Sequence, residues 1–227
     1  MGFLAEQGIK PEDFQKELVT LFASWAQLPG DQNTRLEKED GIFFASAMMV
    51  DLVKEETALH TPEVLDAFYN LATASKAPFM RDRGLELLHD LASGVPAYAA
   101  GRAFDAAQKQ LSDADSDLAS HAASTLANMA MEKLPGAENA GVLLAEAMGS
   151  GPDAHARRMA GITFTQHYPY LVKSADDWDK NLSPVFKKAA AANGVDAAEV
   201  AEAEASVKEM RDFLAGNRKP GGAAPGA

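Results

Sequence analysis

The 227-residue sequence contains no cysteine. Disulfide bonds, thiolate catalysis and zinc sites with cysteine ligands are therefore excluded. Isoleucine is also scarce, with only 3 occurrences. Because β-branched residues dominate strands, this scarcity is an argument against a sheet protein.

Long apolar runs and basic charge are lacking as well. No run approaches the roughly 20 apolar residues that span a bilayer. Acidic residues number 33 against 21 basic ones, which gives a net charge of −12, and the acidity is concentrated near the start of the chain. Since proteins that bind phosphate-rich partners normally present a basic surface, we predict no nucleic-acid partner and no membrane partner.

The first residues do not resemble a targeting signal. The stretch from Met1 to Glu6 has neither a basic start nor a long apolar segment. Gly2 begins a possible myristoylation motif, but Glu6 occupies the position where that motif needs serine or threonine. The sequence predicts a cytoplasmic protein, with export through a removed or non-classical signal left open.

What the chain does have is alanine, with 44 occurrences, and leucine, with 22. Alanine is the best helix former, so the fold class is predicted to be all-α, with about ten helices. Prolines followed by helical patterns mark several expected helix starts, because proline is favoured in the first turn: Pro11, Pro62, Pro78 and Pro96. We expect one helical domain over residues 1–216 and a disordered Gly/Ala/Pro tail over 217–227.

Some helix boundaries follow from polar residues. A polar stretch over 31–40 predicts the longest loop, which is either functional or a tolerated insertion, before a second helix over about 41–56. Ser112 and Asp115 predict a capping box for the sixth helix. Pro184 is expected to interrupt the ninth helical region.

An internal repeat is the most informative pattern. The stretches that begin at Met80, Leu118 and Ala156 align at an offset of 38 residues. Small residues recur in register at one position and large apolar residues at another, namely Gly84, Ala122 and Ala160, and Leu88, Leu126 and Phe164. Such a period is typical of stacked helical units, in which short side chains allow helix axes to approach closely.

This pattern resembles HEAT-like and armadillo-like repeats over about residues 41–170. The resemblance implies a short right-handed α-solenoid of paired antiparallel helices. The alternative is an orthogonal helical bundle with the same number of helices.

Known catalytic and metal-binding patterns are absent from the sequence. No two of the five histidines lie three or four residues apart, so no helical metal pair is predicted. Asp113, Asp115 and Asp117 imitate the start of a calcium loop, but Leu118 occupies the position that requires glycine. We therefore predict no catalytic residue, no metal and no cofactor, and we lean towards a protein that is not an enzyme.

One basic cluster stands out in this acidic chain. If the repeat register is right, its members lie near the starts of equivalent helices and line the concave face, where they could bind an acidic segment of a partner. The cluster consists of Arg81, Arg83, His121, Arg157 and Arg158. The alternative is that these side chains form salt bridges within the stack, to Asp82, Asp117 and Asp153.

The function predicted from these patterns is that of a non-enzymatic interaction or scaffold protein that offers an extended groove. The expected partner is a protein or peptide, either basic overall or with an acidic segment that meets the basic cluster. An apolar seam in the last helix, over 197–215, predicts either a homodimer or a cap on the end of the stack. The alternative function is a bundle that binds or acts on a small apolar ligand in an interior that contains Phe43, Phe44, Met48, Met49, Phe68 and Tyr69.

Overall fold

The computed structural model describes residues 3–174 and 176–216. These residues form twelve α-helices and no strand, which confirms the all-α prediction. The predicted disordered tail, 217–227, lies outside the described residues. Within the described part of the chain, no helix is both long and apolar enough to cross a membrane.

Most of the helices are between 10 and 24 residues long. Their bounds are α1 (Phe3–Glu6), α2 (Pro11–Ala26), α3 (Gln32–Glu55), α4 (Pro62–Ala74), α5 (Pro78–Gly94), α6 (Pro96–Gln110), α7 (Ser116–Met131), α8 (Ala140–Ser150), α9 (Ala154–Gln166), α10 (Tyr168–Leu171), α11 (Ser183–Ala192) and α12 (Ala197–Leu214). The predicted proline starts of α2, α4, α5 and α6 are confirmed.

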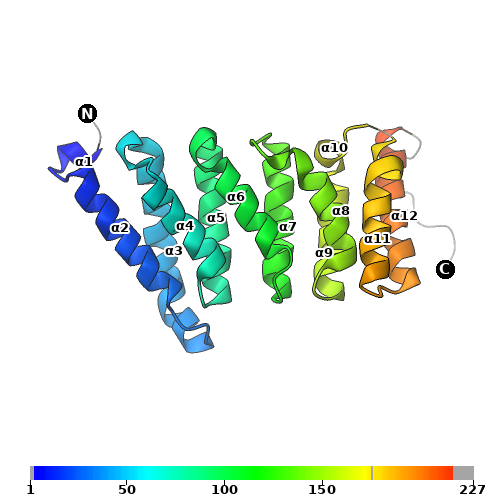
Figure 1. Cartoon of the computed structure of the whole chain (residues 1–227), viewed down its shortest axis with the longest axis horizontal. Helices are drawn as coiled ribbons and strands as arrows, with labels where there is room; N and C mark the ends of the chain where they lie inside the picture. The colour runs from blue at the N-terminus through cyan, green and yellow to red at the C-terminus, as the bar shows by residue number, and fades with distance from the viewer. Residues whose placement is uncertain (1–2, 175, 217–227) are drawn as a thin grey trace.

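The helices lie side by side in chain order along the longest axis, from α1 at one end to α12 at the other (Figure 1). Consecutive helices pair. Helices further apart in the chain also touch: α3 packs on α5, α5 on α7, α7 on α9 and α9 on α12. We call these five helices the second layer. Buried apolar residues form one connected core along this row, from Leu4 to Val207.

The 38-residue register appears directly in the second layer. Helices α5, α7 and α9 begin at Pro78, Ser116 and Ala154, which are 38 residues apart. The small residues of the register are buried, and so is Ser46 at the same position of α3. The large residues Leu88, Leu126 and Phe164 are fully buried, at 0% exposure each.

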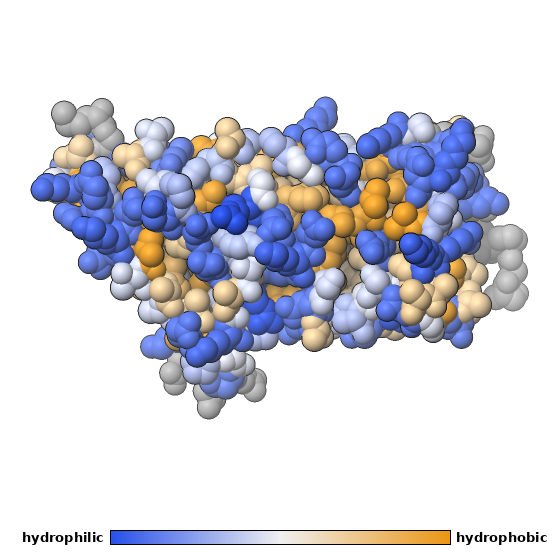
Figure 2. All heavy atoms as spheres, in the orientation of Figure 1, coloured by the Kyte–Doolittle hydropathy of each residue, from blue (hydrophilic) through white to orange (hydrophobic). Residues whose placement is uncertain are grey.

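The predicted loop over 31–40 is wrong, because α3 already begins at Gln32. The segment has no apolar face, so it lacks the periodic signal of a buried helix. Its first turns extend beyond the ends of the neighbouring helices (Figure 1). The side chains described there, Arg35, Lys38 and Asp40, are exposed, and the coloured surface at this end is mostly hydrophilic (Figure 2). An ion pair between Arg35 and Glu39, one turn apart at 2.8 Å, supports the helix there.

Two further boundaries differ from the sequence prediction. The N-cap of α7 is Asp115, whose carboxylate accepts hydrogen bonds from two backbone N–H groups of the first turn, and Ser112 takes no part in it. Pro184 lies in the first turn of α11 and begins that helix, where its missing N–H costs nothing. The irregular part precedes it, as a single turn of π-helix over Trp178–Leu182.

Candidate functional site

The five residues of the predicted basic cluster all lie in the first two turns of second-layer helices. Arg81 and Arg83 belong to α5, His121 to α7, and Arg157 and Arg158 to α9. The repeat register therefore brings them to the same end of the layer. Their side chains differ greatly, however, in how far they are already engaged within the chain.

Arg81 and Arg157 occupy the same register position and make the same contacts. Each guanidinium donates to a backbone carbonyl six residues earlier, at the end of the preceding helix: Arg81 to Ser75 at 3.1 Å and Arg157 to Gly151 at 3.4 Å. Each also pairs with an acid in or just before the next second-layer helix, so that it links two neighbouring repeat units of the row. Arg81 bonds Asp113 at 3.2 Å, and Arg157 holds both carboxylate oxygens of Glu199, at 2.7 and 3.0 Å.

These two arginines therefore tie one unit of the row to the next. Both side chains are largely buried, at 19% and 16% exposure. The helix carbonyls that they bind are otherwise unpaired at a helix end, where positive charge is favoured. The hydrogen bond from Arg157 to Glu199 raises the pKa of its guanidinium.

Arg83 has a similar role at the start of the row. Its guanidinium donates to the Ser46 hydroxyl and to the Phe43 carbonyl of α3, both at 3.0 Å, and it lies over the Phe43 ring. A third bond at 2.8 Å goes to Glu86 on its own helix. This side chain thus fastens α5 to α3, and its donors are occupied.

His121 is more exposed, at 59%, and links α7 to α5 through a 2.7 Å contact between its Nδ1 and Asp82. Burial lowers the pKa of His121, but the hydrogen bond with Asp82 and the charges of Glu86 and Asp117 outweigh burial and leave the pKa raised above 6.5. Burial raises the pKa of Asp82 in turn. For His121, the structure therefore agrees with the alternative prediction, a salt bridge to Asp82 within the stack.

We expect His121 to make stability depend on pH. Because its pKa is higher in the folded than in the unfolded chain, its contribution is complete below about pH 6.5 and is lost as the pH rises through the folded pKa. The contribution of such an exposed pair is about 0.5 kcal/mol. The difference in free energy of unfolding between wild type and His121→Gln should shrink between about pH 6 and pH 8. A difference that grows over this range would contradict the assignment.

Arg158 is the exception in the cluster. Its side chain is exposed, and no hydrogen bond or ion pair to it is found among the described residues. It lines a groove that runs between α9 and α12, which we call the α9–α12 groove. The groove is open along one side and has a volume of about 600 Å³.

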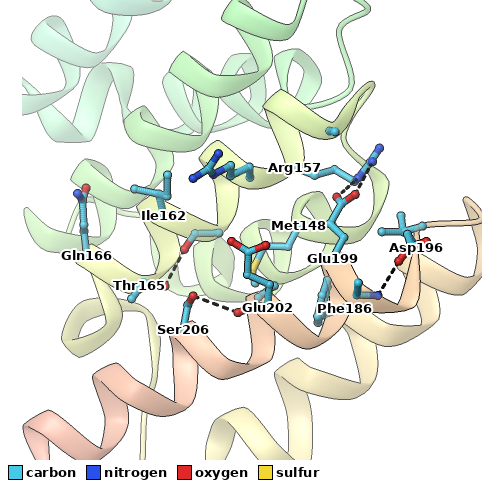
Figure 3. A pocket seen from close by; sticks show the side chains of 16 residues that line it. Met148, Arg157, Ile162, Thr165, Gln166, Phe186, Asp196, Glu199, Glu202 and Ser206 are labelled. Atoms are coloured by element: carbon cyan, nitrogen blue, oxygen red, sulfur yellow. Dashed lines mark hydrogen bonds and ion pairs between the residues drawn. The ribbon is translucent and has the colours of Figure 1, made fainter. Parts of the chain in front are cut away.

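The α9–α12 groove has apolar residues below and polar residues on both walls. Met148 of α8 and Phe186 of α11 come from the other layer, while Ile162 and Thr165 project from α9 and Glu202 from α12 (Figure 3). The complete lining is Met148, Ala154, Arg157, Arg158, Gly161, Ile162, Thr165, Gln166, Phe186, Val195, Asp196, Ala198, Glu199, Glu202, Ala203 and Ser206. The Arg157–Glu199 ion pair bridges the two walls near the starts of both helices.

A glycine opens this groove at a position where earlier units carry side chains. Gly161 is 38 residues after Ala123 and 76 after Leu85, and both of those are buried by the rest of the stack, at 0% and 1% exposure. A methyl group at Gly161 would meet only the end of Met148, at 3.8 Å. Gly161 is not among the predicted site residues, although the 38-residue register contains the signal, a glycine where the earlier units have larger residues.

The expected apolar interior near the start of the chain is wrong in part. Phe68 is fully buried, but Phe44 and Met48 are 69% and 73% exposed. They lie on α3, which is the first helix of its layer. No other second-layer helix in the described chain covers its outer side, so residues placed inward by periodicity face outward.

The apolar seam of the last helix packs on the chain itself for most of its length. Val207 is fully buried, and Val200, Ala203 and Met210 pack against the core, while Leu214 is 49% exposed. Helix α12 thus covers the end of the row, as one of the two predicted roles requires. A homodimer through this helix stays a prediction.

We expect the same substitution to destabilise the chain at Arg157 and to have little effect at the adjacent Arg158 of α9. Arg157→Met keeps the apolar stem but removes the charged hydrogen bonds to Glu199, so the free energy of unfolding should fall by about 1.5 kcal/mol. Arg158→Met is the matched control and should change it by less than about 0.5 kcal/mol. Urea denaturation of both variants measures the difference. Equal losses would show that Arg157 does not act as a tie between units.

Within the described residues, no group of three or more metal-binding side chains is arranged to hold an ion. Comparison of the chain with protein-family models, curated proteins and solved structures found no match in any of the three. The resemblance to HEAT-like and armadillo-like repeats therefore stays a prediction.

Proposed function

We propose that this chain is a non-enzymatic protein–protein interaction or scaffold protein, built as a helical-repeat solenoid, that docks a protein or peptide partner in the α9–α12 groove. The observation that carries the proposal is the groove itself, with apolar residues at its base and an unpaired Arg158 on its wall. An apolar centre with a polar rim is the usual anatomy of a specific interface. The remainder of the predicted basic cluster supports the groove by tying the units together.

Three of the cluster residues are thereby given a different role from the one expected. Arg81, Arg83 and Arg157 each donate hydrogen bonds to acceptors of a neighbouring helix or loop, so binding a partner through them would first cost the free energy of breaking those bonds. Arg158 remains as the candidate for direct contact with an acidic segment in the groove, while His121 is paired with Asp82 and lies outside the groove lining. Charge reversal of the three buried arginines would disturb the fold and is not a clean test of binding.

A photo-crosslinking side chain placed at residue 162 tests the proposal. Ile162 lines the groove and is 39% exposed, while Val142 lies on α8 outside the groove lining and is 40% exposed. Irradiation in the native source should crosslink a protein to position 162 and not to the matched position 142. Equal capture from both positions, or capture from position 142 alone, would contradict docking in the groove.

The groove also fits a second candidate function, the binding of a small apolar ligand. Its volume of about 600 Å³ falls within the usual range of ligand pockets, and Ile162, Ala198 and Ala203 give it apolar surface. Native mass spectrometry of the purified chain distinguishes the two functions. A bound small molecule that is lost in a Gly161→Leu variant would favour the ligand over a protein partner.

A further inference from the structure

We infer that the occupant of the α9–α12 groove is an amphipathic helix of the partner, whose apolar stripe has a basic residue on one flank and an acidic residue on the other. This inference rests on the proposed function and names the chemistry of the partner. It follows from the length of the groove, the helical backbone of both walls and the two opposite charges, one on each wall.

The groove has the length of a short helix. Its lining residues on α9 extend from Ala154 to Gln166, which corresponds to about 18 Å, or just over three helical turns. A bound helix of that length presents apolar residues at intervals of three and four to the base of the groove. These residues would mainly contact Ile162 and the alanines of the lining, because Met148 and Phe186 beneath them are only 3% and 1% exposed.

The walls favour a helix over an extended segment. Both walls are regular helices, so their interior backbone N–H and C=O groups are already bonded within α9 and α12. An extended peptide would find few backbone partners there and would leave its own polar groups unsatisfied over an apolar surface. A helix satisfies its backbone internally and needs only side-chain contacts.

Two unpaired charges of opposite sign determine the flanks. Arg158 belongs to the α9 wall and Glu202 to the α12 wall; both side chains are exposed, and neither has an ion pair among the described residues. The two other acids of the lining are already engaged. Glu199 is held by Arg157, and Asp196 accepts the backbone N–H of Ala198 as the N-cap of α12. The groove therefore matches a helix with an acid beside Arg158 and a base beside Glu202, and it repels helices with two like flanks.

The test uses three synthetic helical peptides with one leucine stripe and different flanks. One peptide carries lysine on one flank and glutamate on the other, the second only lysine and the third only glutamate. Fluorescence anisotropy measures their binding to the full chain. The wild type should bind the mixed peptide most tightly, by roughly fivefold over each of the others, since one exposed ion pair is exchanged for a repulsion. This ranking does not depend on the direction in which the helix lies.

Charge variants should change the ranking in a defined way. Arg158→Glu should come to prefer the lysine-only peptide, and Glu202→Lys should come to prefer the glutamate-only peptide. Gly161→Leu fills the groove at the position where the equivalent Leu85 is buried. It should weaken the binding of all three peptides at least tenfold, while circular dichroism shows that the chain stays folded. Unchanged preferences in both charge variants, or full binding by Gly161→Leu, would overturn the inference.

Other occupants give different results in the same assay. If sodium decanoate binds the wild type more tightly than the peptides do and displaces them, the groove takes a small apolar molecule and the inference of a helical partner is wrong. If sedimentation shows that the chain self-associates and Gly161→Leu abolishes this, the occupant is a second copy. Crosslinking of a protein to position 162 without peptide selectivity would leave the proposed function intact and refute only the helical ligand.

Discussion

Replacing Gly84 with alanine is expected to lower the free energy of unfolding by about 2 kcal/mol or more. Gly84 lies where α5 crosses α4, and a Cβ there would lie 2.3 Å from the backbone nitrogen of Ala72 and 2.6 Å from its Cα. These are backbone atoms of a buried helix and cannot move aside alone. The two helices would have to separate, which disturbs the core on both sides of the crossing.

The chain offers a matched control for this prediction. Gly101 is an exposed glycine within α6, and a Cβ there meets nothing within 4 Å. Gly101→Ala should therefore stabilise the protein by about 0.5 to 1 kcal/mol, because alanine loses less backbone entropy in a helix. Thermal and urea unfolding of both variants should give opposite signs. If Gly84→Ala is neutral or stabilising, the close α4–α5 crossing is not present in the protein.

Phe164→Ala is expected to have the largest effect of the single substitutions considered, a loss of about 3 to 5 kcal/mol. Phe164 is fully buried at the large position of the register, with its ring centroid 5.1 Å from that of Trp178 and 6.1 Å from that of Tyr168. Its removal leaves a cavity between α9, α10 and the π-helical turn. Such a loss is a large share of the 5 to 15 kcal/mol that stabilise a typical domain.

Ile162, two residues earlier on the same helix, provides the comparison. It is 39% exposed on the groove wall, so Ile162→Ala should cost less than about 1 kcal/mol. Tryptophan fluorescence during denaturation, from Trp25 and Trp178, follows the unfolding of both variants. If both variants lose the same stability, the assignment of Phe164 to the core and Ile162 to the groove is wrong.

The sequence predicted the helical units well where an apolar face is present. The 38-residue register, read from small residues such as Gly84 and large ones such as Leu88, coincides with the starts of three second-layer helices. The prediction of a loop before α3 was wrong, because the polar residues after Gln32 form a helix that projects from the core and has no apolar stripe. Local propensity and an ion pair maintain that helix without leaving a periodic signal.

The candidate site was predicted only in part, for a physical reason. Sequence position showed that the basic residues share one end of a layer, but not that Arg157 reaches Glu199, 42 residues later. The groove depends on how far α12 stands from α9, which is a matter of packing. Gly161 was the one local sign of the groove, because glycine stands there at a register position where the earlier units have buried side chains.

The affinity of the captured partner for two matched variants tests the central claim most directly. Ile162→Asp places a charge in the α9–α12 groove, and Val142→Asp places the same charge on an equally exposed site of α8. Calorimetric titration should show a Kd at least tenfold higher for Ile162→Asp than for the wild type, and a change of less than twofold for Val142→Asp. Equal affinities for wild type and Ile162→Asp would show that the partner does not dock in the groove.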